Sequence, residues 1–421
     1  MASPRVHRRH VTVVALVIPL VVATVFTAAS GAAASSAEQS ARALAKNATH
    51  GHGHRSGLET DVQALAGDAT QGRDNNTPGS LLAQRYLISQ LKTFAVGLNT
   101  SRSGDDAYKQ PIVDGTNIIG LIPGGELANQ YVVVGAHYDH LGSSCPTSVA
   151  TDHICNGATD NAASVAEVLS IGREIARRPK PPRRSVILAF WDREEDGLLG
   201  SQFYVGHPLR PLAQTVAYVN YDIQGANLLP SLRGDTFAIG SETGGPQLQS
   251  IVARDAKHGP LRLHSVSSIF GEGRSDYVNF IGARIPTVFF SDSTGPCYHT
   301  AQDEIGVVDF RKLGRQAKIG LDVVRKLVAG DRVPFSGSNP VATFEDAEAL
   351  NLVANRAIVD IGRFDPSQQA TLLKFHDDLN AIVARGPANF GAGDVGTLLS
   401  GAANAVNLLS TGTCNGFLKG R

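Results

Sequence analysis

Buried-strand patterns alternate with helix patterns between residues 131 and 329, and this alternation limits the possible folds more than any other feature of the chain. Continuous apolar runs predict buried strands. These runs are residues 131–136, 185–190, 216–221 and 286–290. Helical spacing of apolar side chains predicts helices near Val165–Ile175 and over 310–329. A repeated strand–helix–strand order predicts an α/β fold with a mainly parallel, twisted, mixed sheet and helices on both faces.

Patterns outside this region predict the domain limits. Helical spacing between Leu81 and Leu91 indicates that the folded domain begins near Gly57. Beyond about Pro340 two helical stretches, roughly 344–364 and 365–385, precede a tail rich in Gly and Ala that ends at Arg421. We therefore expect a main domain over 57–339 and a C-terminal helical appendage over 340–421 that packs against it.

The composition excludes several classes of protein. The 421 residues carry 38 Lys plus Arg and 38 Asp plus Glu, so the formal net charge is +0. Only 18% of residues are charged, and 42% are hydrophobic. These values exclude a disordered chain, a nucleic-acid binder driven by bulk positive charge, and a polytopic membrane protein. The oligomeric state is left open.

The N-terminus has the order of a secretory signal peptide. Basic residues between Arg5 and Arg9 precede an apolar run over 11–29 and the small residues Ala32, Ala33 and Ala34. We expect a signal peptide over 1–34, a flexible or pro-segment over 35–56, and a secreted protein without stable membrane association after cleavage. The alternative is an uncleaved membrane anchor, because about 18 apolar residues begin to span a bilayer.

Four cysteines fit an exported chain, since an even number in an oxidising compartment favours disulfides. The favoured pairs are Cys145–Cys155, which closes a short loop, and Cys297–Cys414. Free buried thiols are the alternative.

Residue types that bind metals follow each predicted strand. In open α/β sheets, ligands bind at the carboxyl ends of the strands. Any one of these side chains could equally cap a helix or form a surface ion pair. The residues concerned are His137 and Asp139, Glu194 and Glu195, Asp222, His299 on a loop, and Asp160 just before a helix.

Together these side chains form an excess of carboxylate over the nearby Arg and Lys residues of the sequence. Burial of unpaired carboxylates costs several kcal/mol each. Divalent cations held by mixed oxygen and nitrogen ligands would stabilise the same group. The sequence therefore predicts a metal site at this edge of the sheet.

The motifs that contain these residues resemble those of the co-catalytic zinc peptidases of family M28, which include secreted bacterial aminopeptidases. The resemblance covers roughly residues 81–329. It rests on His137-Tyr-Asp139, Gly157-Ala-Thr-Asp160-Asn161, Glu194-Glu195 through Ser201, Asn220-Tyr-Asp222, Ser275-Asp276 and Tyr298-His299.

The resemblance implies a role for each matched residue. It implies two Zn²⁺ per chain, with His137 and Asp222 on one ion, Glu195 and His299 on the other, and Asp160 between them. The same comparison implies that Asp139 orients the His137 imidazole and that the Asp160–Asn161 peptide bond is cis. Glu194 would act as general base, and Tyr298 would donate a hydrogen bond to the oxyanion. Arg274 is a weaker candidate for that donor.

The function that follows is removal of N-terminal residues from a peptide substrate. Carboxypeptidase, dipeptidase and amidohydrolase activities stay open, because the motifs do not report the specificity loops. Glutaminyl cyclases of this fold lack the second-site aspartate, which this chain retains as Asp222. A metal-free binding protein would lack ligands or the base. His140 and His153 are set aside, because the five ligands are complete without them.

Overall fold

The computed structural model describes residues 57–143, 145, 152–339, 341–411 and 414. The predicted signal peptide and the 35–56 segment lie outside these residues. In the described part of the chain, no helix has the length and apolar character needed to cross a membrane.

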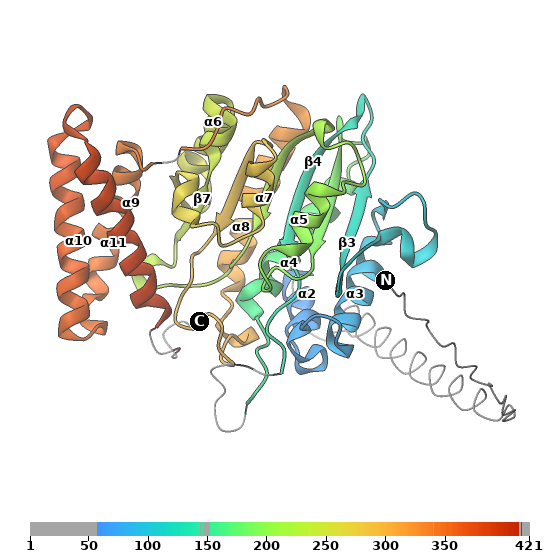
Figure 1. The fold of residues 1–421 in the computed structure, drawn as a ribbon, viewed down its shortest axis with the longest axis horizontal. Helices are drawn as coiled ribbons and strands as arrows, with labels where there is room; N and C mark the ends of the chain where they lie inside the picture. Colours follow the sequence, from blue (N-terminus) through green and yellow to red (C-terminus); the bar gives the residue numbers. More distant parts are fainter. Residues whose placement is uncertain (1–56, 144, 146–151, 340, 412–413, 415–421) are drawn as a thin grey trace, which may run out of the picture.

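One mixed sheet forms the centre of the molecule (Figure 1). Among the described residues it has nine strands, in the order β1-β3-β5-β4-β6-β9-β7-β8, with β2 beside β3. The neighbours β5, β4, β6 and β9 run parallel to one another. β3 runs antiparallel to β5, and β7 runs antiparallel to β9. The strands are β1 (Val96–Gly97), β2 (Lys109–Ile112), β3 (Gly115–Ile122), β4 (Leu127–His137), β5 (Arg184–Trp191), β6 (Thr215–Tyr221), β7 (Asp235–Ile239), β8 (Arg262–Val266) and β9 (Thr287–Ser291).

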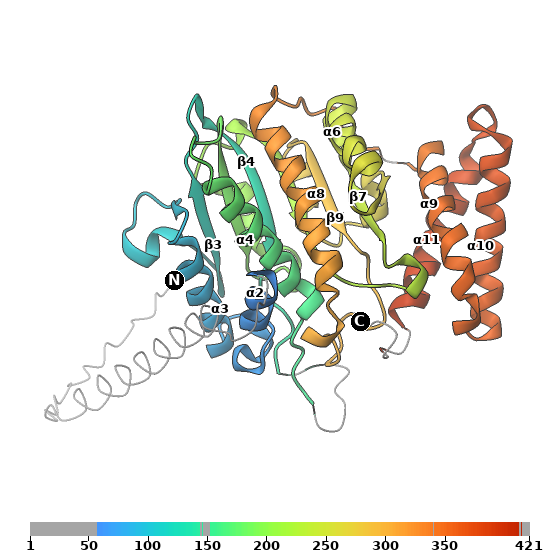
Figure 2. The ribbon, with the colours of Figure 1, turned by 180° about the vertical axis from the view of Figure 1, so that it is seen from behind.

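Helices cover both faces of this sheet. One face, seen in Figure 2, carries α2 (Gly57–Leu65), α3 (Pro78–Leu91), α4 (Ala163–Ala176), α6 (Gly245–His258) and α8 (Phe310–Ala329). The other face carries α5 (Leu199–Gly206) and α7 (Tyr277–Gly282). Because both faces are covered, every residue of β5 and β6 is buried. The four predicted strands correspond to β4, β5, β6 and β9, so the predicted fold class is confirmed.

The sequence patterns missed the remaining strands. β2 and β3 belong to the antiparallel edge, and β7 and β8 are five-residue strands near the opposite edge. The short strands contain few consecutive apolar residues, so their pattern is weak. β3 is eight residues long, but glycines and polar residues interrupt its apolar run.

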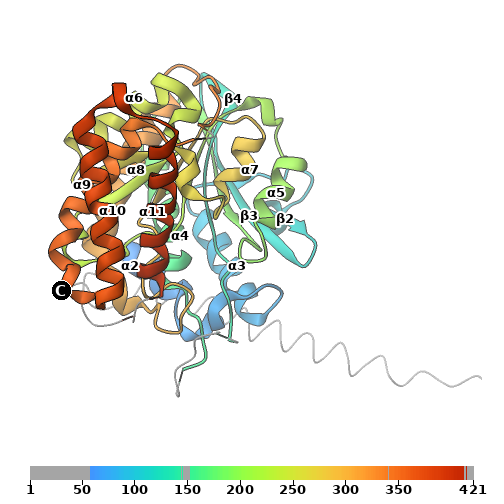
Figure 3. The same ribbon diagram turned by 60° about the vertical axis from the view of Figure 1, so that its left-hand side comes forward.

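Three helices form the C-terminal appendage, defined here as residues 341–411 and 414 (Figure 3). They are α9 (Phe344–Ala357), α10 (Pro366–Arg385) and α11 (Ala392–Ser410), and a 3-10 turn follows α9 at Ile358–Arg363. Thr343 and Asp365 begin α9 and α10 with capping boxes. The Gly/Ala-rich tail was expected to follow the last helix, yet it contains α11. Gly401 of α11 lies so close to the ring of Phe375 that a Cβ would collide with it, so packing against α10 outweighs the low helix propensity of glycine.

Two disulfides, Cys145–Cys155 and Cys297–Cys414, connect loops of the structure. Both predicted pairs are therefore confirmed, and no described cysteine is free. The second pair joins the appendage to the loop that precedes His299.

Candidate metal centre

The carboxyl ends of three adjacent parallel strands carry the predicted site residues. β4 ends at His137, Asp222 directly follows β6, and Glu194 and Glu195 follow β5 by a short turn. Because β5, β4 and β6 are parallel neighbours, these side chains meet at one edge of the sheet. Asp160 comes from the turn before α4, and His299 from the loop after β9.

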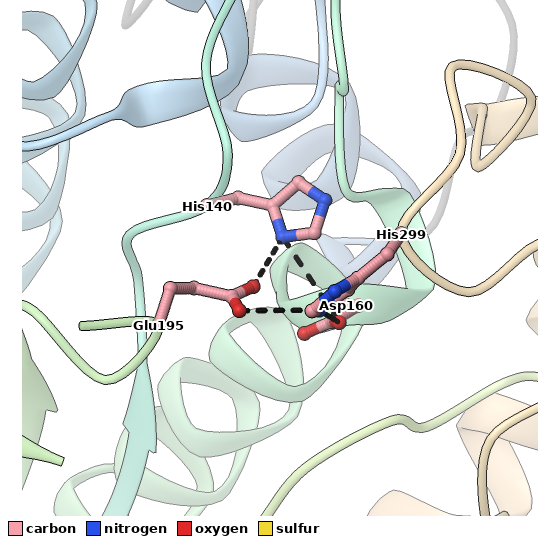
Figure 4. Close-up of side chains that lie close together, drawn as sticks. All are labelled: His140, Asp160, Glu195 and His299. Atoms are coloured by element: carbon pink, nitrogen blue, oxygen red, sulfur yellow. Dashed lines mark hydrogen bonds and ion pairs between the residues drawn. The ribbon is translucent and has the colours of Figure 1, made fainter. Parts of the chain in front are cut away.

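The first group of donor atoms contains four residues (Figure 4). The Nε2 atom of His299 lies 3.1 Å from Glu195 Oε2 and 3.3 Å from Asp160 Oδ2. The Nδ1 atom of His140 lies 2.7 Å from Glu195 Oε1. One donor atom from each of the four side chains lies within 4.8 Å of the others, so the set has the size of a single ion site.

His140 is the member of this group that the sequence analysis set aside. It is buried and contacts both Glu195 and Asp160. Its position three residues after His137 on the same loop is the only sequence signal for it.

The second group contains His137, Glu194 and Asp222. The His137 Nε2 atom lies 3.4 Å from Asp222 Oδ1 and 3.9 Å from Glu194 Oε2. Asp222 was predicted here as a ligand and Glu194 as a base, and the structure brings both carboxylates to the same imidazole.

Asp160 lies between the two groups. Its Oδ1 atom is 3.4 Å from His137 Nε2, and its Oδ2 atom is 3.3 Å from His299 Nε2. The Asp160–Asn161 peptide bond is cis, as the resemblance implied. The Asn161 amide fixes this turn beside β6, since it donates to Tyr221 O and accepts from Ile223 N.

The chemistry of this donor set fits divalent zinc ions. Carboxylate oxygens and imidazole nitrogens are the ligands that zinc binds alongside thiolate. Asp160, Asp222 and Glu194 are all buried, and no described Lys or Arg forms an ion pair with them. The donor set therefore has the chemistry of a zinc site, and Asp160 lies within reach of both groups.

Asp139 connects the loops that carry the ligands. Its Oδ1 atom lies 3.5 Å from His137 Nδ1, and its carboxylate accepts hydrogen bonds from the backbone N–H groups of Glu194 and Glu195. A carboxylate in this place fixes the orientation of the imidazole. The orienting role of Asp139 stays a prediction.

Arg73 is a site-supporting residue that the sequence analysis missed. Its guanidinium is fully buried and donates to four backbone carbonyls, those of Leu65, Tyr138, Asn156 and Gly157. Burial lowers its pKa to about 10, although Asp160 and Asp139 oppose this shift. Arg73 thus supplies a positive charge near the carboxylates and joins both ligand loops. No sequence signal indicated it, because it lies far from the motifs along the chain.

The adjacent residues Glu194 and Glu195 have opposite pKa shifts. Burial raises the pKa of Glu194 well above its usual value, and the nearby carboxylates of Asp222 and Asp276 add to the rise while His137 opposes it. Burial and Asp160 would also raise the pKa of Glu195, but the contacts with His140 and His299 lower it to about 2. Opposite environments of this kind separate a proton-accepting carboxyl from a carboxylate that stays ionised.

Tyr298 and Arg274 both line the cleft above the two groups. The Tyr298 ring stacks on the His299 imidazole at 3.8 Å between ring centroids. Arg274 forms an ion pair with Glu272 at 3.0 Å, and both side chains are part-exposed at the rim. All the predicted site residues except Asp139 and His299 thus line one cleft of about 80 Å³.

The sequence of this region matches a known family model. Residues 117–324 match the model of peptidase family M28. The chain belongs to this family.

Individual relatives of this M28 peptidase differ in their named activities. The "leupeptin-inactivating enzyme 1" of Streptomyces exfoliatus is 25% identical over 71% of this chain and 65% of its own length. A "probable glutamate carboxypeptidase LAMP1" of Arabidopsis thaliana is 29% identical over 45% of this chain, but only 27% of its own length is matched. The chain thus spans less than two thirds of these relatives.

A solved structure agrees with the fold of this M28 peptidase. A "leucine aminopeptidase precursor" from Bacteroides thetaiotaomicron superposes with a TM-score of 0.50 at 19% identity, over 64% of this chain and 95% of that one. At this identity the similarity concerns the fold alone.

Proposed function

We propose that this M28 metallopeptidase is an exported di-zinc aminopeptidase that removes N-terminal residues from peptides. The observation that carries the proposal is the position of Asp160, whose two carboxylate oxygens face the two donor groups at 3.4 and 3.3 Å from His137 and His299. A single ion would need only one of these groups. The two disulfides fit a protein of an oxidising compartment, which supports export.

The charges in the cleft favour an amino-terminal substrate over a carboxyl-terminal one. Five carboxylates line it, those of Asp160, Glu194, Glu195, Asp222 and Glu272. The one Lys or Arg among its described lining residues is Arg274, which is already paired with Glu272. Because Asp160, Glu195 and Asp222 would bind the zinc ions, Glu194 and Glu272 are the lining carboxylates left for an α-ammonium group. A C-terminal carboxylate would have to compete with Glu272 for Arg274.

Zinc ions at such a site polarise the substrate carbonyl and lower the pKa of water to about 7. Glu194 would accept a proton from the attacking water and transfer it to the leaving amine, and its raised pKa suits both steps. Glu195, His299, His137 and Asp222 would act as ligands, and Asp160 would join the two sites. Tyr298 would donate its hydroxyl proton in a hydrogen bond to the developing oxyanion, since burial raises its pKa and keeps it protonated.

The first test compares metal content with substrate preference. We expect two zinc ions per chain, and hydrolysis of leucine p-nitroanilide but not of its N-acetylated form. Equal hydrolysis of both would contradict the aminopeptidase and favour an amidase. Zinc-loaded protein that cleaves only C-terminally unblocked peptides would establish a carboxypeptidase, the second candidate named by the relatives.

A second test separates the base from the ligands. Glu194→Gln should lower kcat by roughly 10²–10⁴-fold and leave the zinc content unchanged. Loss of an ion in this variant would show instead that Glu194 is a ligand beside His137 and Asp222. Glu348→Gln, the same change on the exposed face of α9, is the matched control and should leave kcat unchanged.

A further inference from the structure

One wall of the catalytic cleft comes from the C-terminal appendage. Val406 of α11 lines the cleft together with Ile239 and Phe289 of the sheet and Phe270 of the loop after β8. Together with Ile223, these four side chains make the apolar part of a lining whose other side chains are mostly charged or polar. The cleft is therefore completed by a residue far outside the matched family region.

Contacts between the end of α11 and the main domain hold this wall in place. The Ser410 hydroxyl, one helical turn after Val406, lies 2.7 Å from the Thr294 hydroxyl, and Thr294 lines the cleft itself. The Cys297–Cys414 disulfide follows directly. On the same helix, Leu409 packs against Leu228, Leu229 and Leu232 of the main domain. The end of α11 is thus tied to the segment that leads to Tyr298 and His299.

A second cavity lies behind this wall. It has a volume of about 150 Å³ and lies between the appendage helices and the main domain. Its lining is apolar except for Ser293 and His376. Val406 and Ser293 are the two residues that line both this cavity and the catalytic cleft, so the Val406 side chain stands between the two spaces.

We propose that Val406 is a specificity-determining residue. Its side chain limits the size of the apolar substrate side chain next to the scissile bond, because it closes the passage from the cleft into the apolar cavity. Leu-sized side chains fit in front of Val406, and indole-sized ones do not. This inference rests on the proposed function, because it assigns a substrate subsite to the same cleft.

The test shortens the Val406 side chain and compares the hydrolysis of two substrates. Val406→Ala should raise the ratio of kcat/KM for tryptophan p-nitroanilide to that for leucine p-nitroanilide by about tenfold or more, as methylene-sized changes in apolar pockets do. Val406→Leu should lower the same ratio. Val353→Ala is the matched control: Val353 on α9 lines only the cavity behind the wall and is half-buried like Val406. It should change the ratio less than twofold.

An unchanged ratio in Val406→Ala, or an equal change in Val353→Ala, would overturn the proposal. A second readout does not depend on turnover: calorimetric affinities of free tryptophan and leucine for the zinc-loaded protein. If the wild-type protein cleaves neither amide, the proposed function fails. In that case, a shift of about tenfold toward tryptophan in the ratio of the tryptophan and leucine affinities of Val406→Ala would support the proposed subsite. An unchanged ratio would contradict it.

Discussion

The sheet domain and the appendage bury their side chains to very different extents. Every residue of β5 and β6 is buried, whereas α10, with 20 residues, buries only Leu379 and Ile382. Burial on both faces fixes the strand ends, so the ligands that follow β4, β5 and β6 have defined positions. The appendage depends instead on a small core of its own and on a few bonds to the main domain. The comparison indicates that the sheet domain positions the candidate ligands, while the appendage contributes one wall of the cleft.

The largest effect of a single substitution is expected at the buried charge of the sheet domain. Arg73→Met removes the donor of four backbone carbonyls and the positive charge near Asp160 and Asp139. We expect the free energy of unfolding to fall by roughly 3–5 kcal/mol, and zinc affinity to fall by roughly 10–100-fold. Urea unfolding and competition with a chelator measure the two quantities.

Arg183→Met is the control for this variant. Arg183 forms a surface ion pair with Glu126, and pairs of that kind contribute about 0–1 kcal/mol. A similar fall in unfolding free energy and zinc affinity in both variants would show that Arg73 contributes no more than a surface arginine does.

Removal of each disulfide in turn tests how far the stability of the protein depends on the covalent link between the appendage and the main domain. Cys297–Cys414 spans 117 residues and Cys145–Cys155 spans 10. In the chain-entropy model the longer loop stabilises by roughly 5 kcal/mol and the shorter by roughly 3 kcal/mol. We therefore expect the Cys297→Ser/Cys414→Ser variant to unfold at a lower urea concentration than the Cys145→Ser/Cys155→Ser variant. The reverse order would mean that helix packing alone holds the appendage.

The smallest effect concerns a charged contact between the two regions. Asp235 of β7 accepts from His264 at 2.8 Å and Arg262 at 2.6 Å, and Arg356 of α9 lies 3.5 Å away. Burial would raise the pKa of Asp235, but His264 and Arg262 lower it. The stabilisation is therefore present above the unfolded pKa of about 3.9 and is lost as the pH falls through the lower folded pKa.

Asp235→Asn should lower the unfolding free energy at pH 7 by about 1.5–3 kcal/mol. Between about pH 5 and pH 2, the unfolding free energy of the variant should fall less than that of the wild-type protein. This range extends about one unit beyond the unfolded and folded pKa values of Asp235. Thermal unfolding at several pH values measures both. An unchanged acid dependence would show that Asp235 does not titrate between the folded and unfolded states. Asp377→Asn, at an exposed position on α10, is the control.

The sequence indicated the central strands and most ligands because their signals are local. The apolar runs of β4, β5, β6 and β9 reflect burial on both faces, and His137 and Asp222 stand at the ends of two of these strands. By contrast, β7 and β8 are short, and α11 contains glycines that a propensity argument excludes from helices. The role given to each ligand stays a prediction, and so do the domain limits at residues 57 and 340.

By itself, the sequence determined the α/β architecture and the edge of the sheet where His137, Asp160, Glu195, Asp222 and His299 meet. It favoured both disulfide pairs, and the structure decided between these pairs and free thiols. Spacing within motifs carries this information, because parallel strands place their carboxyl ends together. Only the tertiary structure placed Arg73 beneath the ligand loops, His140 against Glu195, and Val406 in the wall of the cleft. These contacts join residues that are distant in sequence or that no pattern marks, and they exist only once the chain has packed.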